Sequence, residues 1–286
     1  MAGTSCTDMA RLITLSAAQA ATAVEWAAAE GWNPGLADLP CFLTQDPGLF
    51  LAMEEDGALL SLISATRYGA DFGFIGFYIA RPDLRGQGHG MAVWRAAMAQ
   101  LEGRLVGLDG VVAQQDNYRK SGFVLAWNTI RFGGVPIRPP VPAQGIRPAA
   151  EVPFAALAAL DRSVFPAERE AYLRAWIAQP GHIALAHVTD GSVTGFGVIR
   201  PAREGHKIGP LVAETPEVAE ALAAALLARV PEGPVFLDVP EPHRAAVALA
   251  ENLGLTPGFE AARMYTGPAP QIRAERLFGG MSLELG

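Results

Sequence analysis

Cysteine is scarce in this sequence, with only Cys6 and Cys41 among 286 residues. Two cysteines cannot build a disulfide framework or a thiolate zinc site, so each is expected to be an ordinary buried or exposed thiol. Long apolar runs are also missing, because the alanine-rich stretch 219–230 is shorter than the roughly 20 residues that a membrane helix needs. Met1–Leu15 has no basic segment followed by a hydrophobic core, as a signal peptide would. These absences predict a cytoplasmic protein that does not contact membranes.

Charge is low and slightly acidic. Only 18% of the residues are charged, and 22 Lys and Arg against 29 Asp and Glu give a formal net charge of −7. Nucleic-acid binders usually present a basic surface, so we expect no nucleic-acid partner. The five histidines form no H-E-x-x-H or His/Cys cluster, which predicts no metal site. Half of the residues are hydrophobic, enough for one large or two ordinary cores, and nothing in this composition indicates the oligomeric state.

A glycine-rich hexapeptide, Arg85 to Gly90, carries most of the chemical information. It follows an apolar run, 72–80, that predicts a buried strand, and it precedes apolar residues at helical spacing: Met91, Trp94, Met98 and Leu101. Glycines between a strand and a helix let a ligand approach the backbone closely. The free amides and the dipole of the first helical turn then favour an anion such as a pyrophosphate. A glycine-rich turn without any ligand is the alternative.

The spacing of the glycines decides which phosphate ligand is expected. Met91 stands where a dinucleotide fold would need its third glycine, and no Gly-Lys-Ser/Thr of a Walker loop is present. The pattern R-x-x-G-x-G behind a strand resembles the acetyl-CoA loop of the GNAT acetyltransferase superfamily. That resemblance implies acetyl-CoA as cosubstrate, direct acyl transfer without a covalent enzyme intermediate, and a pyrophosphate site and pantetheine-binding strand edge formed by the following residues: Tyr78, Ile79, Ala80, Arg85, Gly86, Gln87, Gly88, His89 and Gly90.

Tyr118 is the candidate catalytic residue. The segment from Tyr118 to Phe123 matches the Tyr-x-x-x-Gly-Phe of the same family, where the tyrosine often protonates the departing thiolate. A ring that only packs on the cosubstrate is the alternative. The family often places an asparagine shortly before this tyrosine, whereas Gln114 and Gln115 stand here, and the sequence identifies no general base.

The acceptor site is expected at the loop after the first helix, which lines the acceptor cleft in GNAT folds. Trp32 is predicted to form a wall of that cleft, and Asn33 and Tyr68 lie in segments that could border it. The resemblance implies acetyl transfer to a primary amine, most simply that of a small molecule. A non-catalytic protein that binds or senses acyl-CoA is the alternative, since neither the asparagine nor a base is found.

The two halves of the chain repeat one another weakly but in the same order. Leu108-Asp109 is matched by Leu237-Asp238, and Gly122-Phe123 precedes Arg131-Phe132 as Gly254-Leu255 precedes Arg263-Met264. A proline-rich stretch separates the halves. We therefore predict an α+β protein with two GNAT-like domains in tandem, each a mixed, mostly antiparallel sheet flanked by helices. The boundaries are 1–135 for the acetyl-CoA domain, 136–146 for the linker and 147–286 for the second domain.

The second half is expected to be a degenerate copy. Where the first half has its glycine-rich loop, the second has 213–217, in which Thr215 is a plain helix cap and Glu214 would repel a pyrophosphate. Ala250 stands in the place of the tyrosine. Only the first half is therefore expected to bind coenzyme A, while the second shapes or covers the acceptor cleft. The expected order of each half is a helical segment, a hairpin (49–80 or 183–212), a helix, a strand, a helix and a closing strand.

Overall fold

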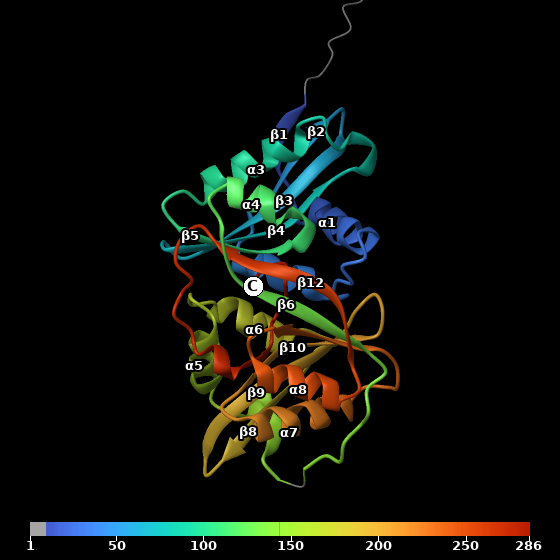
Figure 1. Ribbon diagram of the computed structural model, residues 1–286, viewed down its shortest axis with the longest axis vertical. Helices are drawn as coiled ribbons and strands as arrows, with labels where there is room; N and C mark the ends of the chain where they lie inside the picture. The colour runs from blue at the N-terminus through green and yellow to red at the C-terminus, as the bar shows by residue number, and fades with distance from the viewer. Residues whose placement is uncertain (1–9, 143) are drawn as a thin grey trace, which may run out of the picture.

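The structure is a computed structural model that describes residues 10–142 and 144–286, so Cys6 and most of the Met1–Leu15 stretch lie outside the described residues. The first half contains β1 (Arg11–Thr14), α1 (Ala17–Ala29), α2 (Asp38–Gln45), β2 (Phe50–Glu55), β3 (Ala58–Tyr68), β4 (Phe72–Ala80), α3 (His89–Gln100), β5 (Leu105–Val111), α4 (Gln115–Lys120) and β6 (Val124–Gly134). Figure 1 shows these elements in blue to green, most of them in the upper part of the molecule and β6 in the middle.

The second half repeats this order in the lower part of Figure 1. It contains β7 (Ile146–Pro148), α5 (Phe154–Val164), α6 (Glu170–Ala178), β8 (Ile183–Thr189), β9 (Ser192–Pro201), β10 (His206–Ala213), α7 (Pro216–Leu227), β11 (Val235–Pro240), α8 (Arg244–Asn252), β12 (Thr256–Tyr265) and β13 (Leu277–Gly279). In the part of the chain that the structure describes, no helix is long and apolar enough to cross a membrane.

Several elements differ from the sequence-based expectation, and the short strands β1, β7 and β13 were not expected. The segments predicted as hairpins each hold three antiparallel strands, because each has a second tight turn. In the first half that turn is Asp56-Gly57, whose positive φ values of 50° and 79° suit a tight hairpin connection. The region between Trp32 and β2, for which the sequence predicted no element, contains α2, a short helix in which Cys41 and Phe42 are buried.

The strands form one continuous 13-stranded sheet in which the halves exchange their last strands. β12, from the end of the second half, lies between β5 and β6 of the first half and pairs with both in antiparallel orientation. β6 in turn pairs with β11 of the second half. Figure 1 shows β6 and β12 side by side in the middle of the molecule. Each half therefore depends on the other to complete its sheet.

Two equivalent buried ion pairs cross between the halves at this exchange. Arg263 on β12 donates to both oxygens of Asp109 on β5, at 2.7 and 2.6 Å. Arg131 on β6 donates to both oxygens of Asp238 on β11, at 2.7 and 2.9 Å. Bidentate arginine–carboxylate pairs of this kind fix the orientation of both partners. The weak sequence repeat thus corresponds to a repeated cross-half contact.

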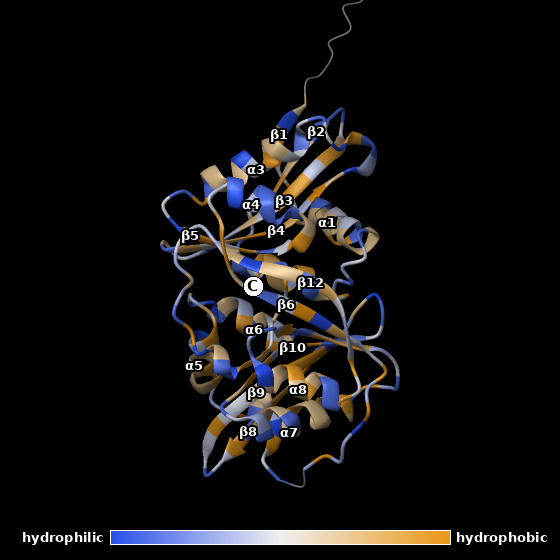
Figure 2. Cartoon of the chain, in the orientation of Figure 1, coloured by the Kyte–Doolittle hydropathy of each residue, from blue (hydrophilic) through white to orange (hydrophobic). Residues whose placement is uncertain are grey.

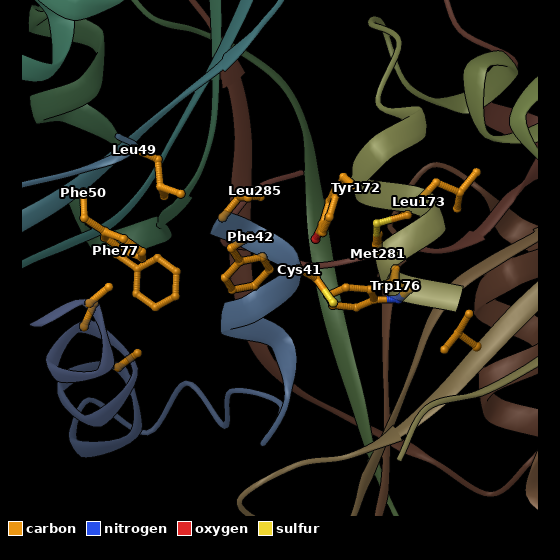
Figure 3. Close-up of a cluster of buried hydrophobic side chains, with 14 of the residues drawn as sticks. Cys41, Phe42, Leu49, Phe50, Phe77, Tyr172, Leu173, Trp176, Met281 and Leu285 are labelled. Atoms are coloured by element: carbon orange, nitrogen blue, oxygen red, sulfur yellow. The ribbon is translucent and has the colours of Figure 1, made fainter. Parts of the chain in front are cut away.

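The largest apolar cluster also spans the two halves, as Figure 3 shows. Phe42 of α2 stacks on Trp176 of α6 with ring centroids 6.1 Å apart, and Phe77 of β4 packs edge-on against Phe42 at 6.0 Å. Figure 2 shows hydrophobic residues along the strands and hydrophilic ones at many of the turns. Cys41 is buried in this cluster, and burial raises the pKa of its thiol to about 12, so it stays protonated.

Candidate active site

The site is built where β4 and β5 separate. They pair in parallel only as far as Ile75 and Leu108, and beyond these residues no further pairs form between them. A β-bulge begins on β4 at the same point, where Phe77 has a positive φ of 46°. The bulge and the lost pairing open a gap between the strands.

The gap between the strands forms a cavity of about 410 Å³. Its apolar walls include Trp32, Trp94, Val111 and Phe259, and its polar groups come from both halves of the chain. The complete lining is Glu30, Trp32, Ile75, Gly76, Phe77, Tyr78, Ile79, Ala80, Arg85, Trp94, Leu108, Asp109, Gly110, Val111, Gln114, Tyr118, Arg131, Phe259, Leu283 and Glu284. A partly open, mainly apolar cavity with a few polar groups is the usual form of a small-molecule site.

The glycine-rich loop lies at the mouth of the cavity and leads into α3. Gly86 and Gly88 have φ values of 82° and 93°, a region that favours glycine, and Gly88 caps α3 without any side-chain hydrogen bond. The first turn of α3 therefore keeps its amides available for an anion. A Cβ on Gly90 would lie 3.0 Å from the Tyr78 hydroxyl oxygen, so the helix approaches β4 closely.

Of the predicted pyrophosphate loop, only Arg85 lines the cavity itself; Gly86, Gln87 and Gly88 are exposed, and His89 and Gly90 are half-buried. Arg85 donates to the carbonyl oxygen of Ala80 at 3.2 Å and forms an ion pair with Glu30. Its guanidinium thus sits at the end of the β4 edge formed by Tyr78, Ile79 and Ala80, all of which line the cavity.

Tyr118 is brought into the cavity from α4. Its ring lies against Trp94, with centroids 5.7 Å apart, and a Cβ on Gly110 would lie 2.2 Å from the ring, so glycine is required there. Burial, followed by the neighbouring Tyr78, raises the pKa of Tyr118 to about 12. The phenol is therefore protonated at neutral pH and able to donate its proton.

The three predicted acceptor residues have different positions. Trp32 lines the cavity, and its carbonyl oxygen accepts a hydrogen bond of 2.6 Å from Arg131. Asn33 does not line it: its side chain accepts from the Glu204 amide at 2.8 Å and donates to the Glu204 carbonyl at 3.1 Å, which ties the loop to the turn between β9 and β10. Tyr68 does not line it either, because its buried hydroxyl donates to the carbonyl oxygen of Leu285 at 2.8 Å.

The corresponding gap in the second half is filled by the chain itself. β10 and β11 pair in parallel only over His206–Ile208 and Val235–Leu237, and a β-bulge on β10 follows. Beyond this point β13 pairs with β10, and the Gly280 amide donates to the Asp238 carbonyl on β11 at 2.9 Å. The helix that follows, α7, is capped by the Thr215 side chain, which accepts from the Val218 amide at 3.4 Å.

The sequence did not indicate several residues of the cavity lining, among them Asp109, Arg131, Phe259, Leu283 and Glu284. Asp109 and Arg131 stand in the repeated dipeptides, so that repeat was a usable signal. The segment 280–286 has no motif that could have indicated its position. Among the described residues, no group of three or more His, Cys, Asp or Glu side chains is arranged to hold a metal ion.

Comparisons with known proteins agree with this geometry. Residues 15–123 match the model of the acetyltransferase (GNAT) family, and residues 157–279 match that of an acetyltransferase (GNAT) domain. The chain is 31% identical over 264 residues to a holothin acyltransferase from a Pseudoalteromonas strain, covering 92% of this chain and 90% of the relative.

Solved structures share the fold over the whole chain. A Pyrococcus horikoshii protein assigned to the acetyltransferases superposes with a TM-score of 0.83 at 20% identity, covering 97% of this chain and 96% of that one. A tandem GNAT protein from the clavulanic acid biosynthesis pathway superposes with a TM-score of 0.62 at 16% identity, covering 91% and 100%. The predicted α+β fold with two such domains is confirmed. The chain belongs to the GNAT acetyltransferase family and is an acyltransferase with two GNAT domains in tandem.

Proposed function

We propose that the first half binds acetyl-CoA and transfers its acetyl group to the primary amine of a small molecule. The observation that carries this is the open cavity between β4 and β5, beside an uncapped helix start and a protonated Tyr118. The pyrophosphate would be held by residues 86–90 and by Arg85, and the pantetheine by the edge of β4 at Tyr78–Ala80. Backbone amides on that edge are suited to stabilise the oxyanion that develops during attack.

The second half does not bind acetyl-CoA in this proposal. Its equivalent gap is occupied by β13, and its helix start is closed by Thr215 with Glu217 in the first turn. The second half instead contributes to the walls of the cavity between β4 and β5. Phe259 comes from β12, and Leu283 and Glu284 come from the segment after β13. The domain boundaries at 135 and 147 remain predictions, since the last strand of each half lies beside strands of the other half within one sheet.

The acceptor is a small, partly apolar amine. Trp32 and Phe259 offer aromatic walls, and the hydrogen bonds between Asn33 and Glu204 bring the second half against the acceptor loop. Such closure leaves less room for a long peptide than an open cleft would. The similarity to an enzyme named for holothin supports a small molecule as acceptor.

In the reaction, the neutral amine attacks the thioester carbonyl carbon, so that the C–N bond forms as the C–S bond breaks. The amine loses one proton, and the departing thiolate gains one. Tyr118 donates that second proton, because its phenol stays protonated until a pH far above neutral.

The experiment is a thiol-release assay with acetyl-CoA and a panel of holothin, phenethylamine, spermidine, amino acids and a histone-like peptide. We expect turnover with at least one small amine and little with the peptide. Preferential acetylation of the peptide would contradict the closed cleft. Tight acetyl-CoA binding without turnover on any amine would contradict amine transfer.

A further inference from the structure

The cavity is lined by three carboxylates, and two of them are already neutralised. Glu30 is paired with Arg85, and both oxygens of Asp109 accept from Arg263. Glu284 differs from these two. It is only 4% exposed, its Oε2 accepts no hydrogen bond, and it belongs to none of the ion pairs found among the described residues.

An unpartnered carboxylate in such a place is costly unless a cation or a proton donor joins it. The charged groups around Glu284 are Asp109 on β5, Arg131 on β6 and Lys207 on β10. Burial raises the pKa of Asp109, and Glu284 adds to this effect; Glu284 also acts electrostatically on Arg131 and Lys207. Arg131 already binds Asp238 on two atoms, and the Lys207 Nζ lies 3.7 Å from the same carboxylate. The Lys207 Nζ makes no hydrogen bond, and neither Lys207 nor Arg131 forms an ion pair with Glu284 among the described residues. Because Glu284 lines the cavity, a cationic ligand bound there can pair with it.

The backbone around Glu284 is held by both halves. The Tyr68 hydroxyl donates to the Leu285 carbonyl, Arg169 donates to the Gly286 carbonyl, and the Leu285 amide donates to the Ser282 hydroxyl at 3.1 Å. The preceding strand, β13, is seated between β10 and β11. The same segment of chain that fills the gap between β10 and β11 thus places the Glu284 carboxylate at the cavity between β4 and β5.

We propose that Glu284 binds the ammonium group of the acceptor and removes its proton, as the general base of the acyl transfer. This rests on the proposed function above. One proton passes from the ammonium nitrogen to a Glu284 oxygen, which leaves a lone pair for attack on the thioester carbon. The proton that Tyr118 gives to the thiolate is a separate one. The nitrogen loses a second proton when the amide forms, and this proton returns to the Tyr118 phenolate, so the two groups act at opposite ends of the transfer.

The test compares the wild-type chain with Glu284→Gln and Glu284→Asp, with phenethylamine as acceptor. An alkylamine has a pKa of roughly 10, so almost all of it is protonated at neutral pH. We expect Glu284→Gln to lower kcat/KM at pH 7 by about 10²-fold, the scale of a lost general base. Its rate should then rise about tenfold per pH unit as the free amine becomes available, while the wild type responds less steeply. Glu284→Asp should recover part of the activity.

Two measurements separate this role from a structural one. Acetyl-CoA affinity of Glu284→Gln should stay within a few-fold of the wild type, and calorimetric binding of phenethylammonium should weaken at least tenfold. Glu251→Gln, on the exposed face of α8, is the control and should match the wild type in both.

Four results would overturn the proposal. Unchanged activity of Glu284→Gln, an unchanged pH profile, or undiminished phenethylammonium binding each exclude Glu284 as the base. A wild-type chain that acetylates no amine would instead overturn the proposed function and this proton transfer together.

Discussion

Gly76 on β4 lies against the backbone of Glu284 so closely that a Cβ at residue 76 would stand 2.0 Å from the Glu284 carbonyl oxygen. Backbone atoms cannot yield at that distance as a flexible side chain could. The contact joins residues 208 positions apart in the sequence and lies at the wall of the cavity. The position of the segment after β13 therefore depends on a glycine in the fourth strand.

Gly76→Ala is expected to displace that segment and to lower turnover by at least about tenfold, because a small misplacement of a catalytic group is costly. The measurement is kcat with acetyl-CoA and the best amine of the panel. Gly280→Ala is the control, since a Cβ there would meet only the Asp238 carbonyl at 3.8 Å. Equal activity of the two variants would show that the segment tolerates displacement.

Gly88→Glu is expected to abolish acetyl-CoA binding, because it places a side chain and a negative charge where the pyrophosphate should lie. Titration calorimetry of the wild type should give one site per chain. Gly103→Glu is a matched control: its φ is also positive, at 81°, but it follows α3 at the far end. Two comparable sites in the wild type would contradict the assignment of binding to the first half alone.

Tyr118→Phe should lower kcat by roughly 10²-fold with little change in acetyl-CoA affinity, the scale of a lost proton donor. Because burial raises the pKa of Tyr118 to about 12, its ionisation should not reduce the wild-type rate below about pH 10. Tyr172→Phe serves as control, since that hydroxyl is buried without a hydrogen-bond partner and does not line the cavity. Full activity of Tyr118→Phe would mean that the ring only packs.

Trp32→Ala should raise the KM of the amine more than the KM of acetyl-CoA, because it removes an aromatic wall of the acceptor cavity. Trp127→Ala removes a ring of the same size that packs on Tyr265, outside the cavity lining. Parallel changes in both constants, or the same change in both variants, would argue against a specific contact between Trp32 and the acceptor.

We expect His182 to lower the free energy of unfolding when the pH falls into the mildly acidic range. Its side chain is fully buried, its Nδ1 lies 2.9 Å from the Trp176 carbonyl oxygen, and burial, followed by Arg200, lowers its pKa to about 4. In the unfolded chain a histidine titrates near 6.5, so the unfolded state binds the proton first and stability is lost as pH falls from about 6.5 to about 4.

Across that window the free energy of unfolding of the wild type should fall by about 3 kcal/mol more than that of His182→Gln. Urea unfolding at pH 8, where the histidine is neutral in both states, provides the reference difference between the two proteins. Parallel loss of stability in both proteins on acidification would show that other groups account for it.

Much of the site could be predicted because its signals are local. The predicted glycine turn between a strand and a helix is present: the glycines at 86 and 88 have positive φ, and α3 begins at His89 directly after them. Tyr118 reaches the cavity from the short helix expected around it. Tyr68 illustrates the limit of this approach: its neighbourhood suggested the acceptor cleft, but its hydroxyl is bound to Leu285, a residue 217 positions away.

Most of the order of helices and strands, the glycine-rich helix start and the tyrosine motif could be predicted from the sequence, because each is set by the conformational preferences of a few neighbouring residues. Three features depend on long-range contacts instead: β6 and β12 are exchanged between the halves, β13 fills the gap between β10 and β11, and Glu284 lines the cavity between β4 and β5. These pairings join strands that have similar hydrophobic patterns and lie far apart in the sequence. The local conformational preferences of the residues therefore do not determine which strands pair. Closure of the ion pairs Asp109–Arg263 and Arg131–Asp238, together with burial of the shared core, makes that choice.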